Sequence, residues 1–177
     1  MYGLLSVIKE EFVYHYGNKK FTLLRSILCY YRVLNFRVTV LICYMQKTQR
    51  LHEKKRVKKK LKLKYGVDIG LNTKIGLHPW VEHYFGLVLG DGVVIGDQCT
   101  FYQGVTLGQR NRKYPTVRNN VVIYPNAVIL GDVEIGDSAI ILAGSIVLKD
   151  VLPNNIVGGN PATVKKEIIC EKKETSF

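Results

Sequence analysis

The sequence is poor in cysteine and lacks the short motifs that bind metals or nucleotides. Its four cysteines, Cys29, Cys43, Cys99 and Cys170, form no CxxC pair and no spacing typical of zinc ligands. A phosphate-binding loop of the GxxxxGK type is also absent. We therefore expect no metal, no nucleoside triphosphate chemistry, and cysteines that are reduced and mainly structural.

Long apolar runs are missing as well. Three arginines interrupt the most apolar stretch, residues 21–45, and no run of eighteen apolar residues occurs. The first residues lack a basic region, and Lys9, Glu10 and Glu11 interrupt any apolar segment that follows, so no signal peptide is predicted. A cytoplasmic protein is expected, and a position at the inner face of the membrane is left open.

Acidic residues are scarce in the first third of the chain. The whole sequence has a net charge of +12, and residues 1–64 hold sixteen Lys or Arg against three acids. Apolar residues at helical spacing predict packed amphipathic helices here, with a break at Gly17 and Asn18. Within residues 47–64, ten of eighteen are basic. This run is either a solvated helix or linker, or a contact for an anionic membrane or acidic polymer; nucleic acid is not expected, because no recognition motif accompanies it.

What the sequence has in abundance is a six-residue repeat. An aliphatic residue returns every six positions through most of the segment from Ile69 to Val147, often followed by Gly. A short fixed period predicts a solenoid, in which each unit buries its apolar side chain against the next unit. Three six-residue faces form one triangular coil, so the repeat predicts a mainly β solenoid of about five coils.

The repeat slips out of phase twice, and a slip marks where the chain leaves the regular wall. The first slip adds two residues around 82–86, and the second contains the polar basic stretch 109–115. We expect the second to be a loop beside the coil of His83, because insertions in repeat proteins tend to lie on the functional face. The predicted organisation is a helical segment 1–64, a solenoid domain 65–160 and a tail 161–177.

Among the four histidines, His83 is the strongest catalytic candidate. His15 and His52 lie in the helical segment, where a surface position is the default, and for His78 we favour a turn over a substrate contact. Asp68 precedes His83 by fifteen residues, almost one coil, so its carboxylate could orient the imidazole as a general base. The alternative is that Asp68 only caps a corner turn.

At this point the motifs resemble a known family. The segments 68–76, Glu82-His83 and Gln103-Gly104-Val105-Thr106-Leu107-Gly108, with 121–162 further on, are similar to the hexapeptide-repeat acyltransferases of the serine acetyltransferase type. The resemblance implies a left-handed parallel β-helix that forms a homotrimer, with acetyl-CoA as co-substrate in the groove between subunits. A dimer of trimers is left open.

The resemblance also implies roles for particular residues. His83 would be the general base and Asp68 its partner. The groups expected along the pantetheine arm are Gly108, Ala143, Gly144 and Pro161. Charge alone suggests that phosphates would meet Arg118, Lys165 or Lys166. Since no Ser or Cys is paired with His83 in the sequence, we predict direct transfer rather than an acyl-enzyme, with Cys99 left open as a nucleophile.

The sequence departs from the family in the region expected to hold the acceptor. Lys113 and Tyr114 stand where serine acetyltransferases have Arg and His, and Glu82 replaces an Asp. Lys cannot reproduce the two-pronged contact of Arg with a carboxylate. Trp80 and Tyr84, with the neighbouring Phe85, add aromatic surface on which a sugar ring could rest; the alternative is that these rings pack at a trimer interface.

These departures favour an acetyl-CoA-dependent O-acetyltransferase that acts on a sugar or bacterial surface polysaccharide, in a plan similar to the colanic-acid type. The substrate contacts expected for this function are Trp80, Glu82, Tyr84, Lys113 and Tyr114. Three alternatives remain: a serine O-acetyltransferase of cysteine biosynthesis, an amino-sugar N-acetyltransferase, and a solenoid that serves only as a scaffold or binding module.

Overall fold

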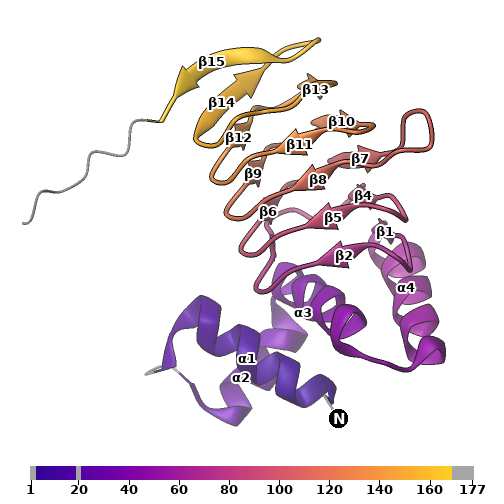
Figure 1. Ribbon diagram of the computed structural model, residues 1–177. Helices are drawn as coiled ribbons and strands as arrows, with labels where there is room; N and C mark the ends of the chain where they lie inside the picture. The colour runs from indigo at the N-terminus through magenta and orange to yellow at the C-terminus, as the bar shows by residue number, and fades with distance from the viewer. Residues whose placement is uncertain (1–2, 19–20, 169–177) are drawn as a thin grey trace, which may run out of the picture.

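In the computed structural model, which describes residues 3–18 and 21–168, a bundle of helices precedes a triangular solenoid (Figure 1). Within these residues the helices are α1 (Leu4–Tyr16), α2 (Leu23–Arg32), α3 (Leu34–Lys47) and α4 (Leu51–Tyr65). The change from helices to coils falls between Tyr65 and Asp68. Both the helical segment and the β solenoid predicted from the sequence are confirmed.

Local sequence explains where the helices begin and end. The Thr22 hydroxyl accepts a hydrogen bond from the Arg25 amide at 3.2 Å and caps the start of α2. At the other end of the bundle, Gly66 adopts a left-handed conformation, with φ of +65°, and ends α4. No described helix is by itself long and apolar enough to cross a membrane; α2 and α3 meet that test only as a pair, which is bent by 105°.

The solenoid is built from parallel strands of two to four residues, followed by one five-residue antiparallel strand. The described strands are β1 (Asp68–Ile69), β2 (Lys74–Ile75), β3 (Trp80–Val81), β4 (Val88–Leu89), β5 (Val94–Ile95), β6 (Thr100–Phe101), β7 (Thr106–Gly108), β8 (Thr116–Val117), β9 (Val122–Ile123), β10 (Val128–Leu130), β11 (Glu134–Ile135), β12 (Ile140–Ile141), β13 (Ile146–Val147), β14 (Asn155–Gly158) and β15 (Thr163–Glu167). They give four complete coils and part of a fifth, close to the predicted five.

The three walls of the triangle are three sheets. Sheet A has the order β1-β4-β7-β10-β13, sheet B has β11-β8-β5-β2, and sheet C has β15-β14-β12-β9-β6-β3. All neighbours are parallel except β15, which pairs antiparallel with β14. We call the turns from a sheet C strand to the next sheet A strand the C–A corner, and those from sheet A to sheet B the A–B corner. The left-handed coil sense implied by the resemblance stays a prediction.

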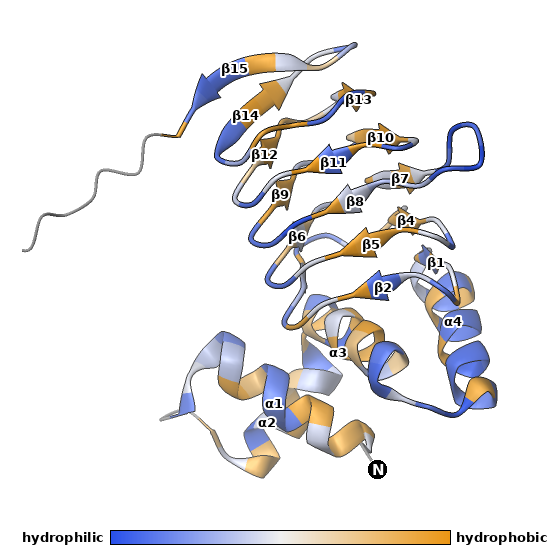
Figure 2. Cartoon of the chain, in the orientation of Figure 1, coloured by the Kyte–Doolittle hydropathy of each residue, from blue (hydrophilic) through white to orange (hydrophobic). Residues whose placement is uncertain are grey.

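The repeated aliphatic residues form the core of the solenoid. In sheet A the stacked residues are Ile69, Leu89, Leu107, Ile129 and Val147, each no more than 2% exposed. In Figure 2 the strands β5, β10 and β14 are orange, whereas β2 and β11 are blue because each contains a charged residue. Burial of one aliphatic side chain per wall and coil is what the six-residue period predicted.

The helical bundle closes the first coil of the solenoid. The Thr39 hydroxyl of α3 accepts a hydrogen bond from the Val81 amide of β3 at 3.3 Å. Helix α4, which contains most of the basic run, buries Val57, Leu61 and Tyr65 and turns its lysines outward. The run is therefore a helix with one buried face, in line with the solvated-helix alternative.

Candidate active site

The C–A corner of the first coil carries an insertion that projects His83. The Glu82 amide donates a hydrogen bond to the Phe101 carbonyl at 2.9 Å. This bond places Glu82 in register with Tyr102. On the far side of the corner, Gly86 lies against Gly104. Three residues, 83–85, therefore lie between Glu82 and Gly86. The same corner in the next coil has only one residue between Tyr102 and Gly104. The inserted residues push the imidazole out of the wall, and His83 is exposed.

Two tyrosines that the sequence reasoning missed lie beside His83. The Tyr102 ring is 6.0 Å from the imidazole, centroid to centroid, in an edge-on arrangement. Tyr124, one coil further, stacks on Tyr102 at 5.0 Å. Burial, Tyr124 and Glu82, in that order, raise the pKa of Tyr102, so its hydroxyl stays protonated near neutral pH. The sequence could have indicated both tyrosines, because the residue that follows each sheet C strand lies at this corner in every coil.

Asp68 has other partners than His83. Its carboxylate accepts from Lys62 Nζ at 2.6 Å and lies 3.6 Å from Lys58 Nζ, both on α4. The hydrogen bond from Lys62 is the main reason why the pKa of Asp68 lies below its usual value. Among the described contacts, none joins Asp68 to His83, so the orienting role of Asp68 stays a prediction.

The aromatic residues near His83 are divided between packing and surface. Trp80 donates its indole N–H to Glu82. Tyr84 packs edge-on against Tyr65 at the end of α4, with centroids 5.7 Å apart. Phe85 is 75% exposed. Of these predicted substrate contacts, Glu82 lies in register with Tyr102, whereas Trp80 packs against His15 of the helical bundle and Tyr84 contacts α4.

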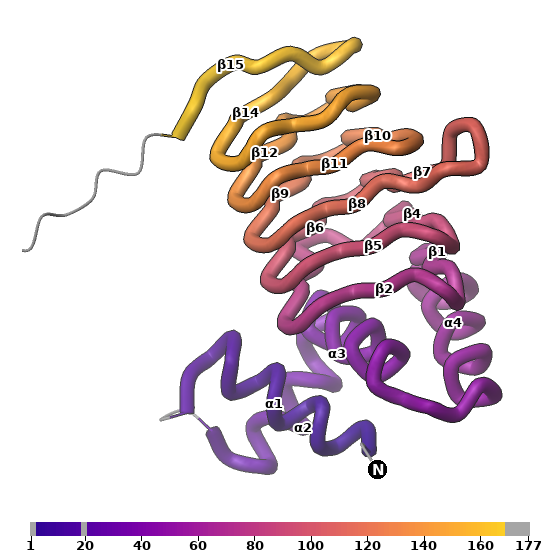
Figure 3. The backbone as a smooth tube through the Cα atoms, in the orientation of Figure 1, coloured from indigo at the N-terminus to yellow at the C-terminus, as the bar shows by residue number. Residues whose placement is uncertain are grey.

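The second insertion lies at a different corner of the same chain. The loop leaves the stack after β7, at the A–B corner, as Figure 3 shows. Lys113 forms an ion pair with Asp132, and the Tyr114 ring lies over the backbone of Gly90 and Gly92, where any side chain would collide with it. The expectation that this loop lies beside the coil of His83 is therefore wrong within one chain, and Tyr114 is a packing residue rather than an open face for a sugar ring.

Small residues follow His83 along the C–A corner. The third coil above it contributes Ala143 and Gly144, and the Gly144 amide bonds the Pro125 carbonyl at 2.8 Å. Gly144 has a φ of +67° and open space in front of its Cα. The Gly159 carbonyl accepts a hydrogen bond from the Ile146 amide, so the turn that contains Pro161 continues the same edge. The small residues Ala143 and Gly144 thus follow the larger rings of Tyr102 and Tyr124 along this edge.

The other predicted cofactor contacts lie elsewhere. Gly108 ends β7 on sheet A, where a Cβ would meet Leu130. Arg118 follows β8 and is paired with Glu134 at 2.7 Å. Lys165 and Lys166 belong to β15, at the end of sheet C. Lys165 nevertheless reaches the C–A corner, because its Nζ lies 3.9 Å from a Cβ placed on Gly159. Of the predicted cofactor contacts, Ala143, Gly144, Pro161 and Lys165 therefore share an edge with His83 within one chain.

Gln103 is a further polar group on this edge. It follows Tyr102 at the C–A corner, and its side-chain oxygen is buried without a hydrogen-bond partner among the described residues. Buried polar atoms in folded proteins usually have partners. The side-chain carbonyl oxygen of Gln103 is therefore an exception to this rule among the described residues.

Cys99 is excluded as the nucleophile left open by the sequence. Its side chain is fully buried in the solenoid, and burial raises the pKa of the thiol to about 11. Cys29, Cys43 and Cys99 are free thiols, as expected; Cys170 lies outside the described residues. Direct transfer remains the chemistry that the site favours.

The prediction for His15 is wrong, whereas His78 is confirmed as a turn residue. The ring of His15 packs 4.5 Å from that of Trp80, and its side chain is 13% exposed rather than at the surface. His78 has a φ of +52° in the turn between β2 and β3. Both imidazoles lie against Glu11, a buried carboxylate on α1.

Comparisons with known proteins agree with this geometry. The family "Bacterial transferase hexapeptide (six repeats)" matches residues 114–149. A serine acetyltransferase of Synechococcus elongatus is 41% identical over 103 residues, which are 56% of this chain and 42% of that protein. One of Staphylococcus aureus is 37% identical over 58% of this chain and 50% of its own. The chain is similar to the serine acetyltransferases.

Solved structures extend the similarity to the helical bundle. The serine acetyltransferase from Brucella abortus in complex with coenzyme A has a TM-score of 0.73 and 28% identity, over 94% of this chain and 68% of its own. The enzyme from Neisseria gonorrhoeae in complex with serine has a TM-score of 0.71 and 26% identity, over 91% and 67%. The chain spans half or less of the length of the curated relatives it matches.

These findings correct the predicted acceptor. The relatives and neighbours are serine acetyltransferases, so a sugar or polysaccharide O-acetyltransferase, with a glycan as partner, is wrong as the leading prediction. The prediction gave decisive weight to Lys113 and Tyr114, which stand where serine acetyltransferases have Arg and His, and the similarity of the chain as a whole outweighs these two departures. The similarity to serine acetyltransferases and the hexapeptide acyltransferase fold predicted with it are confirmed.

Proposed function

We propose that this chain is a serine O-acetyltransferase that transfers the acetyl group of acetyl-CoA to the hydroxyl of L-serine. Two observations together support the proposal. Both sequence and fold are similar to serine acetyltransferases, and the first coil of this chain carries an exposed histidine, His83, on an insertion at a corner.

In the proposed mechanism His83 acts as general base. It takes the proton of the serine hydroxyl as that oxygen attacks the acetyl carbonyl carbon, and the new C–O bond replaces the C–S bond. The imidazolium then returns the proton to the sulfur of the leaving thiolate. General-base assistance of this kind is worth roughly 10²–10⁴-fold. The position of His83 on a projecting corner supports this role, because the imidazole can reach an acceptor outside the wall.

The C–A corner would hold the co-substrate. Gly144 leaves open space beside the wall, since a Cβ there would meet no atom within 4 Å. The pantetheine arm would run along the corner toward His83. The coenzyme A complex of the similar Brucella abortus enzyme supports a coenzyme A site in this fold.

A homotrimer is part of the proposal. Phe85, two residues from His83, exposes 75% of its surface in the single chain. An apolar ring of this size at a projecting corner is well suited to contact with a neighbouring subunit. Light scattering of the purified protein should give a mass three times that of the chain, or six times if two trimers pair.

Release of free thiol from acetyl-CoA tests the function. The purified protein is mixed with acetyl-CoA and L-serine, glycine, D-serine or glucosamine, and the rate is compared with that of His83→Ala. We expect release with L-serine alone among these acceptors. Equal release with every acceptor, or only with the amino sugar, would contradict the proposal.

A further inference from the structure

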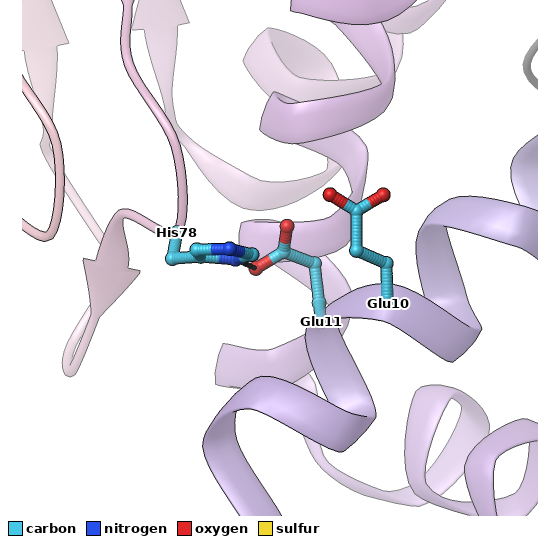
Figure 4. Close-up of side chains that lie close together, drawn as sticks. All are labelled: Glu10, Glu11 and His78. Carbon is cyan, nitrogen blue, oxygen red and sulfur yellow. Dashed lines mark hydrogen bonds and ion pairs between the residues drawn. The ribbon is translucent and has the colours of Figure 1, made fainter.

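A second cluster of ligating groups lies away from His83, where α1 meets the first coil. Glu10 and Glu11 project from α1 toward His78, in the turn between β2 and β3, as Figure 4 shows. One ligating atom from each of these residues lies within 4.8 Å of the other two. Glu11 is 1% exposed, and its Oε2 is 3.3 Å from His78 Nδ1.

More ligating groups surround this cluster. His15 Nε2 lies 3.4 Å from the same Glu11 oxygen, and this buried nitrogen makes no hydrogen bond of acceptable geometry within the described residues. The buried thiol of Cys43 also contacts Glu11. Burial by itself would raise the pKa of Glu11, but the adjacent imidazoles of His15 and His78 outweigh it and lower that pKa. The carboxylate is therefore ionised in the folded protein, as a ligand must be.

We propose that Glu10, Glu11 and His78 bind one divalent transition-metal ion of the zinc class. Two carboxylate oxygens and one imidazole nitrogen are a donor set typical of such ions. Two ligand atoms that are each about 2.0 Å from a tetrahedral zinc ion are separated by about 3.3 Å. The separation between His78 Nδ1 and Glu11 Oε2 has this value, so these two ligands need little movement to bind the ion.

The remaining ligand and the entry path also fit. Glu10 is paired with Lys47, and a doubly charged ion would replace that single ammonium as its partner. A surface cavity of about 420 Å³, lined in part by Glu10, Tyr14 and His78, gives the ion access from solvent. The fourth coordination position would face this cavity and hold water or the nearby His15.

The bound ion would fasten the helical bundle to the solenoid. Glu10 and Glu11 belong to α1, whereas His78 belongs to the wall of the first coil, sixty-seven residues after Glu11. A metal that binds the folded state and not the unfolded chain raises the free energy of unfolding by mass action. The site would thus stabilise the position of α1 and does not depend on acetyl transfer.

Calorimetric titration of zinc into the chelator-treated full chain tests the site. The variant His78→Asn removes the ligand and keeps a residue that tolerates the left-handed turn, with a φ of +52°. Glu11→Gln removes the central oxygen charge. His52→Ala is the matched control, because His52 lies 4.0 Å from Glu53 on the surface and is 77% exposed.

We expect one zinc ion per chain, at least tenfold weaker binding in both site variants, and unchanged binding in the control. The single tryptophan gives a second readout, since Trp80 lies 4.5 Å from His15 and a bound Co²⁺ or Cu²⁺ ion should quench its fluorescence. His78→Asn should abolish that quenching while the far-ultraviolet circular dichroism stays native. Absence of stoichiometric binding, or equal binding in folded His78→Asn, would overturn the proposal.

Discussion

His83→Ala should lower the turnover rate and leave the free energy of unfolding nearly unchanged. The side chain is exposed, and its one described ring contact is the edge-on approach to Tyr102 at 6.0 Å. Surface substitutions of this kind change the free energy of unfolding by no more than about 0.5 kcal/mol. Loss of a general base lowers turnover by roughly 10²–10⁴-fold. That factor corresponds to a barrier higher by about 2.7–5.5 kcal/mol.

The assay compares His83→Ala with His52→Ala, which truncates an exposed histidine on α4. Initial rates of thiol release with saturating L-serine give kcat, and urea unfolding gives the free energy of unfolding. We expect kcat to fall only in His83→Ala and both variants to unfold near the wild-type midpoint. The reasoning is refuted if His83→Ala retains at least half of the wild-type kcat, or if it loses activity because it no longer folds.

Three further predictions concern the core, the thiols and the acid partner. Ile129→Ala removes a fully buried side chain from the middle of sheet A and should cost about 2–5 kcal/mol of stability, measured by urea unfolding; a cost below 1 kcal/mol would contradict the core described here. Cys99→Ala should keep the wild-type kcat, because a thiol with a pKa of about 11 is not the nucleophile; loss of turnover in a folded variant would show otherwise. The pKa of Asp68 is lower in the folded state than in the unfolded chain, so its ion pairs stabilise the fold above about pH 4 and this contribution is lost as the pH falls through the lowered pKa. Lys62→Gln should therefore lower stability at pH 7 and leave it unchanged at pH 2; equal loss at both would refute the ion pair as the cause.

The solenoid could be predicted from the sequence because its period is a local property. Each aliphatic residue from Ile69 to Val147 has to face the axis if the coils stack, so spacing alone fixes the column of buried side chains. The insertion at His83 followed from the same count, since two extra residues in a fixed period must leave the wall. Position along the repeat thus identified both the core and the projecting candidate base.

The surroundings of Glu11 could not be predicted in this way. Its contacts with His78 depend on how α1 lies on the first coil, and the two residues are sixty-seven positions apart. Periodicity contains no information about that docking angle. His15 was assigned to the surface for the same reason, whereas the structure places it against Trp80.

The acceptor prediction failed because it rested on residues of one loop, although the fold and the similarity to serine acetyltransferases were predicted correctly. Tyr114 offered a flat ring in a polar loop, and the sequence could not show that Gly90 and Gly92 one coil earlier provide a surface for it. Glycines at stacked positions create such flat surfaces because they have no side chain. Only the register of the coils identifies which ring covers them. The same register brings Tyr102 and Tyr124 beside His83.

Mass spectrometry of the product tests the central claim most directly. The purified chain is incubated with L-serine and acetyl-CoA that carries a ¹³C label in the acetyl carbonyl, and the amino-acid products are analysed. The account predicts O-acetylserine with the label in its ester carbonyl, formed by the wild-type chain and not by His83→Ala. Unmodified serine after complete incubation of the folded wild-type protein, or equal labelling by the variant, would contradict it.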